Sequence, residues 1–118
     1  YTPVSVADNK IKKSDSDMSI PLKRTTDILK FLGENKKPGQ FICGFSMETE
    51  NMLDNSRKKL EKKNADMIVA NSLVTGGAGF GTDTNIVTLI TKDNIKEYDI
   101  MSKEKVADTI LDAIINGF

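Results

Sequence analysis

The residues of this 118-residue chain that could carry chemistry are mainly its lysines, because the sequence contains no histidine. Histidine is the usual general base of enzymes and the commonest side-chain ligand of transition metals. Without it, any chemistry must run on lysines, carboxylates, backbone amides and an added metal ion. The lysines with informative spacing therefore come first.

Two lysines of a predicted helix over residues 48–65 are candidates for anion binding. At about 100° per residue, the buried stripe of this helix consists of Leu53, Ser56 and Leu60, with Met52 on its border. Lys59 and Lys63 lie at the edge of the stripe, whereas Lys58 and Lys62 point the opposite way and are predicted to be solvated. Lysines four residues apart repel each other unless an anion lies between them. The alternative, which is the commoner case for this pattern, is that both extend from the border to water.

Two other segments are weaker candidates for phosphate binding. Lys10, Lys12 and Lys13 form a run that is usually a solvated patch, and the alternative is a mobile lysine that closes over a triphosphate. Residues 75–85, TGGAGFGTDTN, hold four of the eight glycines. This loop lacks the Lys-Ser/Thr of a P-loop and the G-x-G-x-x-G spacing, and it precedes a predicted strand instead of a helix. We therefore assign no ligand to its glycines.

Composition limits the classes of function. The chain is 38% apolar and 29% charged, as in an ordinary soluble globular domain. Its 17 basic and 17 acidic residues give a formal net charge of zero, which argues against bulk electrostatic binding of nucleic acid. We find neither a signal peptide nor an apolar stretch long enough to span a bilayer, and expect no membrane partner. The single cysteine, Cys43, can form no internal disulfide and indicates a reducing cytoplasm.

The elements that must position these residues form an α/β pattern. Residues 41–45 are a continuous apolar run, typical of a strand buried on both faces. Residues 66–72 are predicted to be another buried strand, and the helix between them makes a βαβ unit. The next strand, NIVTLITKD, turns at Asp93-Asn94 into a short antiparallel neighbour, KEYDIM. Ser102 is predicted to cap the last helix. The repeating apolar residues of that helix are Val106, Ala107, Ile110, Leu111 and Ile114.

The amino-terminal part is less regular. Residues 1–17 are predicted to be a mobile loop, and residues 18–24 an edge or irregular strand because they contain Pro21. A short helix follows, with Thr25 or Thr26 as its N-cap. Its predicted apolar side consists of Ile28, Leu29, Phe31 and Leu32. Ligands of α/β sheets bind outside the carboxyl ends of the strands, so we expect TTDI, SMETEN and SLVTGGAGFGTDTN to meet at one edge.

Several motifs, taken in chain order, resemble those of bacterial phosphopantothenate–cysteine ligase. They are KIKK, TTDI, GFSMETEN, KKLEKKNADMIVAN, GFGTDTNIVTLIT and MSKEKVADTIL. That ligase is commonly the C-terminal half of a bifunctional coenzyme A biosynthesis protein. The implied fold is α/β, three-layer and Rossmann-like (ribokinase-like), with helices on both faces of a mostly parallel sheet and a short antiparallel edge. Residues 1–118 would be the C-terminal part of one ligase domain, with 1–17 as flap or loop, 18–118 as the α/β body, and an upstream part expected to be missing.

The reaction that the resemblance implies has two steps. The carboxylate of 4′-phosphopantothenate attacks the α-phosphate of CTP, with Mg²⁺, and gives an acyl-cytidylate and pyrophosphate. The amine of cysteine then attacks the activated carbonyl and releases CMP. CTP is expected over ATP because GFSMET resembles the bacterial form of the motif. The resemblance also implies a homodimer, and FMN only if a decarboxylase half is fused upstream.

The resemblance further implies roles for individual residues. Lys10, the first lysine of KIKK, matches a catalytic lysine that also contacts the nucleotide, on a flap that closes over the intermediate. The other positions that match nucleotide-binding residues of the family are Thr26, Asp27, Ile28, Phe45, Lys59 and Lys63. The helical-wheel argument separates Lys59 and Lys63 from Lys58 and Lys62 independently. The motifs do not identify metal ligands.

The chain departs from the family pattern in three places. The family usually has proline at Thr26, small residues at Ser46 and Met47, and an aspartate at Ser72. Two other interpretations stay open. One is a non-catalytic nucleotide-binding or regulatory fragment of the same fold, and the other is a dinucleotide-binding oxidoreductase domain, against which the absence of G-x-G-x-x-G argues.

Overall fold

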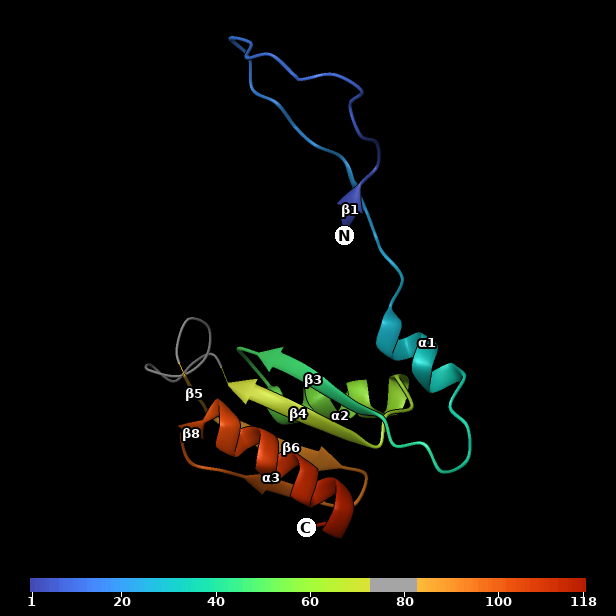
Figure 1. The fold of residues 1–118 in the computed structure, drawn as a ribbon, viewed down its shortest axis with the longest axis vertical. Helices are drawn as coiled ribbons and strands as arrows, with labels where there is room; N and C mark the ends of the chain where they lie inside the picture. The colour runs from blue at the N-terminus through green and yellow to red at the C-terminus, as the bar shows by residue number, and fades with distance from the viewer. Residues whose placement is uncertain (73–82) are drawn as a thin grey trace.

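The computed structural model describes residues 1–72 and 83–118, which form an α/β body and an extended amino-terminal arm (Figure 1). The described helices are α1 (Ile28–Glu34), α2 (Met52–Lys62) and α3 (Lys103–Asn116). The longer strands are β3 (Cys43–Glu48), β4 (Met67–Ser72), β6 (Val87–Thr91) and β7 (Ile95–Glu97). The two-residue strands are β1 (Thr2–Pro3), β2 (Leu22–Lys23), β5 (Thr84–Asn85) and β8 (Met101–Ser102). Of the Gly-rich segment 75–85, residues 75–82 lie outside the described part.

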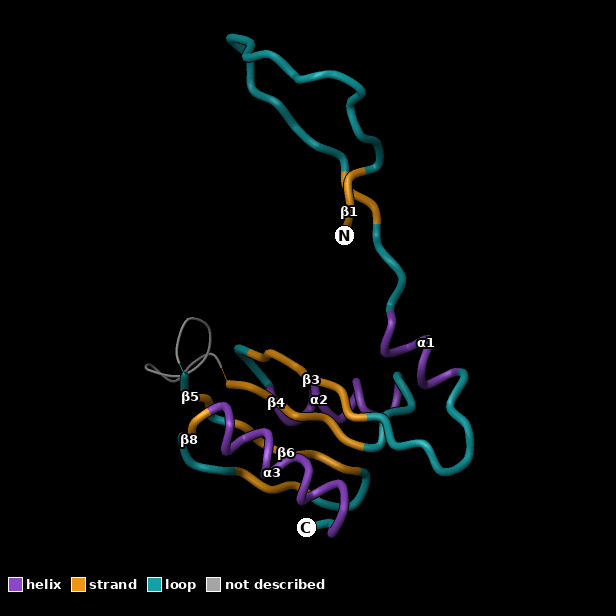
Figure 2. Tube along the Cα trace, in the orientation of Figure 1, coloured by secondary structure: helices purple, strands orange, loops and turns teal. Residues whose placement is uncertain are grey.

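The central sheet has the strand order β3-β4-β6-β7. β3 and β4 are parallel over their whole lengths, and α2 is the crossover between them. β7 pairs antiparallel with β6 across the predicted turn at Asp93-Asn94, where the Thr91 N–H donates to the Asn94 carbonyl. α2 covers one face of the sheet and α3 the other (Figure 2). The three-layer α/β class, the βαβ unit and the hairpin are therefore confirmed.

The antiparallel part of the sheet is larger than the short edge that we predicted, because β6 also runs antiparallel to its neighbour β4. A parallel neighbour needs a crossover connection of about a dozen residues or more, usually with a helix. The sequence between Ser72 and Val87 is rich in glycine, which disfavours a helix. The antiparallel pairing of β6 with β4 needs no crossover helix.

The core lies between β4, β6 and α3, and its buried members are Met67, Val69, Val87, Leu89, Val106 and Ile110. β4 has buried residues on both faces, as predicted. The same prediction was wrong for β3, in which Gly44 and Ser46 are buried but Phe45 and Met47 are exposed. β3 is the last strand of the described sheet on its side, beyond the part that α3 covers (Figure 1).

α3 begins where the sequence predicts. The Ser102 hydroxyl accepts a hydrogen bond from the Lys105 N–H at 3.1 Å, which confirms Ser102 as the N-cap. Val106 and Ile110 are buried. Leu111, predicted on the apolar side, is 57% exposed, because fewer residues of the helix contact the sheet than the apolar pattern predicts. None of the described helices has the length and apolar character needed to cross a bilayer.

The arm consists of residues 1–27 and projects away from the body (Figure 1). β1 and β2 pair antiparallel at its base, which places the predicted irregular strand at Leu22–Lys23. The radius of gyration is 18.6 Å, whereas a compact chain of this length has about 13–14 Å. Lys10 is exposed on the loop between β1 and β2. The arm therefore holds Lys10 on a long extension with little packing.

The N-cap of α1 lies one or two residues later than the threonines predicted for it. Its N-cap is Asp27, whose carboxylate accepts a hydrogen bond from the Lys30 N–H at 3.0 Å. The prediction of Thr25 or Thr26 was wrong because aspartate competes for this position and is the stronger capping residue. Leu29 is partly buried, but the rest of the predicted apolar side is exposed, namely Ile28, Phe31 and Leu32.

Ser56 on α2 is fully buried, and its hydroxyl has no hydrogen-bond partner among the described residues. We expect Ser56→Ala to raise the free energy of unfolding by about 1 kcal/mol, because it removes a desolvated hydroxyl and favours the helix. Ser102→Ala is the matched control, since it deletes a hydroxyl that caps α3 and should lower stability by about 1 kcal/mol. Urea unfolding of both variants measures the two changes in the free energy of unfolding, which should have opposite signs. A destabilised Ser56→Ala chain would mean that the hydroxyl has a partner.

Candidate functional site

α1 and α2 meet closely at Gly33. A Cβ added to Gly33 would lie 1.7 Å from the Lys63 carbonyl oxygen, and the Asn64 side-chain amide donates to the Gly33 carbonyl at 2.9 Å. Leu29 of the same helix lies over Gly44 of β3, where an added Cβ would be 2.7 Å from the leucine Cδ2. These contacts place the end of α1 beside the end of α2 and its first turn over β3.

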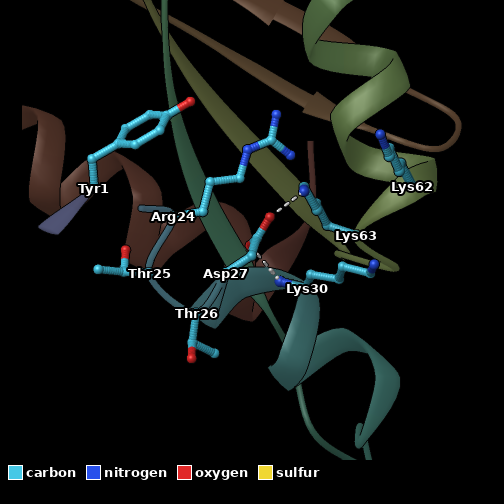
Figure 3. Close-up of a pocket in the computed structure, with 8 residues that line it drawn as sticks. All are labelled: Tyr1, Arg24, Thr25, Thr26, Asp27, Lys30, Lys62 and Lys63. Atoms are coloured by element: carbon cyan, nitrogen blue, oxygen red, sulfur yellow. Dashed lines mark hydrogen bonds and ion pairs between the residues drawn. The ribbon is translucent and has the colours of Figure 1, made fainter. Parts of the chain in front are cut away.

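A pocket of about 500 Å³ lies between these two helices (Figure 3). It is lined by Tyr1, Arg24, Thr25, Thr26, Asp27, Lys30, Lys62 and Lys63. Four of these residues are cations, and Asp27 supplies a carboxylate. An excess of positive charge in a concave site favours an anionic ligand.

An ion pair between Lys63 and Asp27 crosses this pocket. The Lys63 ammonium donates to the Asp27 carboxylate, which also accepts from the Lys30 N–H (Figure 3). The hydrogen bond from Lys63, and next the one from the Lys30 N–H, hold the pKa of Asp27 below its ordinary value. The Asp27 side chain is 46% exposed, whereas that of Lys63 is 18% exposed. An anion that enters the pocket can therefore replace the accessible carboxylate as the partner of Lys63.

Lys59 has a different partner. Its ammonium donates to the Glu48 carboxylate at 2.6 Å and to the Ser46 hydroxyl at 2.9 Å. The Ser46 hydroxyl in turn donates to the same Glu48 oxygen at 2.6 Å. Hydrogen bonds from Lys59 first, and then from Ser46, lower the pKa of Glu48. Lys59 is thus fixed at the end of β3 by a largely buried carboxylate.

The structure brings three of the predicted site residues to one pocket: Thr26, Asp27 and Lys63. Lys59 lies one helical turn before Lys63 and contacts Glu48 and Ser46 instead. In Figure 3 the Thr26 side chain points away from the Asp27 carboxylate. Lys62 is exposed, as predicted, and it also contributes to the lining of the pocket.

The other predicted site residues lie apart from the pocket. Ile28 is 69% exposed on α1. Phe45 is 63% exposed. It alternates along β3 with Gly44 and Ser46, so its side chain projects from the face of the sheet opposite to the one on which Ser46 contacts α2. Lys10 is on the arm. The described structure does not bring these three residues to Lys63.

Of the three segments expected at the sheet edge, SMETEN meets Ser72, the first residue of SLVTGGAGFGTDTN, whose residues 73–82 lie outside the described part. β3 ends at Glu48 and β4 at Ser72, as parallel neighbours. Asn71 near the end of β4 accepts a hydrogen bond from the Asn85 side chain at 2.9 Å. The third segment, TTDI, follows β2, which pairs with β1 outside this sheet. TTDI instead reaches α2 through the packing of α1.

Sequence reasoning missed several residues of the site. Arg24 and Lys30 line the pocket, and Glu48 and Ser46 bind Lys59. Glu48 belongs to the quoted motif GFSMETEN, so its place in a motif was an available signal. Nothing in the spacing of Arg24 or Lys30 indicates that they line the same pocket as Lys63.

Neither a metal cluster nor a reactive thiol is evident in the described part of the chain. Residues 1–72 and 83–118 contain no group of three or more Cys, Asp or Glu side chains arranged to hold a metal ion. Burial raises the pKa of the Cys43 thiol to about 11, so at neutral pH this residue is a protonated thiol. The pocket of cations stays the candidate site.

Comparison with known proteins decides the family. The model of the DNA/pantothenate metabolism flavoprotein C-terminal domain (DFP) matches residues 1–118. The chain belongs to the DFP family. Its predicted resemblance to the C-terminal ligase portion of the bacterial coenzyme A biosynthesis protein is thereby confirmed.

Proteins similar to this chain carry names that describe different activities. The coenzyme A biosynthesis bifunctional protein CoaBC of Bacillus subtilis (strain 168) is 53% identical over 115 residues, which cover 97% of this chain and 28% of that protein. A cysteine/cysteine sulfinic acid decarboxylase from an unknown prokaryotic organism is 43% identical over 116 residues, covering 98% of this chain and 32% of that protein. The chain spans less than a third of either relative.

Solved structures show the same fold. The crystal structure of the C-terminal domain of CoaBC matches with a TM-score of 0.68 and 44% sequence identity. The match covers 80% of this chain and 43% of that one. The DFP fold seen in that domain therefore confirms the Rossmann-like α/β class.

Proposed function

We propose that this DFP protein is a CTP-dependent phosphopantothenate–cysteine ligase of coenzyme A biosynthesis that works in the cytoplasm as a homodimer. The observation that carries the proposal is the cationic pocket in which Lys63 faces Asp27 beside Thr26. These are positions that the family motifs match to nucleotide binding. Similarity to CoaBC over nearly the whole chain supports the same substrates, 4′-phosphopantothenate and cysteine. We further propose that residues 1–118 are part of one ligase domain, and that FMN belongs only to a fused decarboxylase half.

The first proposed step is activation of the acid. A carboxylate oxygen of 4′-phosphopantothenate bonds to the α-phosphorus of CTP, and the bond to the bridging oxygen breaks, so pyrophosphate leaves with the electron pair. In the second step the cysteine amine bonds to the acyl carbon, CMP leaves, and the amine loses a proton. Positioning and neutralisation of phosphate charge are the main requirements of such transfers. A histidine-free site rich in lysine is suited to both.

Each lysine has a separate proposed role. Lys63 exchanges the exposed Asp27 carboxylate for a phosphate oxygen, and Lys59 donates to the nucleotide from its fixed position. Lys10, on the arm, closes over the acyl-cytidylate as a flap residue. Mg²⁺ bound to the CTP phosphates would neutralise their charge, and Asp27, the carboxylate that lines the pocket, would be its protein ligand, which fits the few protein ligands that Mg²⁺ uses.

The test of the proposal is pyrophosphate release from CTP by the full-length gene product. Release should require 4′-phosphopantothenate but not cysteine, because the acid is activated before the amine reacts. Release that requires cysteine would contradict this order of steps. CTP binding without any pyrophosphate release would support the alternative of a non-catalytic nucleotide-binding protein.

Lys63→Ala should raise the CTP concentration needed for half-maximal rate by about 10-fold or more, since a charge-assisted hydrogen bond to phosphate contributes about 1.5–3 kcal/mol. Lys59→Ala should act in the same direction. Lys58→Ala is the matched control on the same helix and should leave the CTP requirement unchanged, because Lys58 is exposed and does not line the pocket. Steady-state kinetics with varied CTP measures all three. Equal effects at Lys58 and Lys63 would show only a general loss of positive charge.

A further inference from the structure

The carboxylate that holds Lys59 is enclosed by donors. Glu48 is 11% exposed at its side chain and accepts from the Lys59 ammonium and the Ser46 hydroxyl, both at 2.6 Å. Its second oxygen accepts from the Asn55 side-chain amide at 3.4 Å. Ser46 is 2% exposed. The three donors come from β3 and α2, so Glu48 joins the end of the strand to the helix that carries Lys59.

Within residues 1–72 and 83–118, the acceptors of the Lys59 ammonium leave one of its donors unused. An ammonium has three N–H donors. Among the described residues, two acceptors lie within hydrogen-bond distance: Glu48 Oε1 at 2.6 Å and Ser46 Oγ at 2.9 Å. The Lys59 side chain is 43% exposed, so the remaining donor can reach a ligand. Two fixed contacts restrict the direction in which the third N–H points.

The two lysine–carboxylate pairs of the site therefore differ. Asp27 is exposed at the pocket and can yield Lys63 to an incoming anion. Glu48 is nearly buried and bound by two further side chains, so losing Lys59 would leave a desolvated carboxylate without its main partner. Lys59 consequently stays on Glu48 when a ligand binds, whereas Lys63 can change partner.

We propose that Glu48 is a positioning residue, which orients the Lys59 ammonium so that its third N–H meets a phosphate oxygen of the nucleotide. The proposal rests on the proposed nucleotide-binding function. Glu48 does not touch the ligand and acts only through Lys59. Ser46 has the same role through one hydrogen bond and contributes less.

The test is a double-mutant cycle on CTP affinity, with the full-length gene product. Glu48→Gln keeps the shape of the side chain and removes its charge, so it should weaken CTP binding by about two- to tenfold in the presence of Lys59, in the lower part of the range for coupled neighbours. In a Lys59→Ala background the same change should have no further effect. Glu50→Gln, at an exposed neighbour, is the matched control and should leave the affinity unchanged in both backgrounds.

The outcomes separate the two proposals. Equal weakening by Glu48→Gln with and without Lys59, or no weakening at all, would overturn the positioning role while leaving the nucleotide site intact. An absence of CTP binding by the unmodified protein would overturn the proposed function and the inference together. If Glu48→Gln does not fold, the cycle is run with Ser46→Ala, for which about a twofold effect that depends on Lys59 is expected.

Discussion

Gly33→Ala is expected to lower the free energy of unfolding by about 3 kcal/mol or more, as overpacking against a fixed group does. The new Cβ would lie 1.7 Å from the Lys63 carbonyl oxygen, which belongs to the backbone at the end of α2 and cannot rotate away. Alanine has the higher helix propensity, by about 1 kcal/mol, so propensity alone predicts the opposite sign. The clash should prevail, and α1 should separate from α2.

Two measurements check this expectation. Chemical denaturation gives the change in stability, and hydrogen exchange should show lost amide protection in α1 but retained protection in β4 and β6. Glu34→Ala, at the next and exposed position of α1, is the control and should change stability little. Because Asp27 is at the start of α1, Gly33→Ala should also weaken CTP binding. A variant as stable as the parent would show that α1 and α2 are not in tight contact.

Lys10→Gln is expected to lower kcat on the order of 100-fold, the size of effect seen when one transition-state donor is removed. The CTP dissociation constant should change by no more than about threefold, because Lys10 is exposed on the arm and reaches the site only when the flap closes. The arm that carries Lys10 projects away from the body (Figure 1). The expected signature is therefore a loss in turnover without a comparable loss in binding.

Single-turnover pyrophosphate release and direct CTP titration separate these two quantities. Lys13→Gln is the matched control, because it removes the same charge from the same exposed loop. Proportional losses in kcat and CTP affinity at Lys10 would make it only a binding residue. Identical behaviour of Lys10→Gln and Lys13→Gln would mean that the run acts by charge alone.

The parts of the fold that the sequence predicts well depend on local patterns. The buried strand at residues 66–72 and the turn at Asp93-Asn94 appear as predicted, and so does the Ser102 cap. The exposure of Phe45 could not be predicted, because it depends on which elements lie beside β3. Likewise, Thr25, Thr26 and Asp27 are adjacent residues that can all cap a helix, and their capping preferences differ too little to predict which one does.

In the candidate site, too, local patterns were predictable and contacts between distant segments were not. Spacing along α2 singled out Lys59 and Lys63, because helical periodicity is fixed by geometry. Their partners could not be predicted, since Asp27 and Glu48 lie 36 and 11 residues away in the sequence and meet them only through the packing of α1 and β3. The edge lysines do have anions beside them, but these are the protein's own carboxylates.

The exposed edge of β3 has a consequence for how this chain behaves in solution. β3 is six residues long, bears the exposed apolar side chains Phe45 and Met47, and pairs with no described strand on its outer side. An open, apolar strand edge is a template for intermolecular β-pairing. β7 closes the other side of the sheet with only three residues, among them Lys96 and Glu97, and is protected by its shortness and charge. Self-association of concentrated samples should therefore begin at β3.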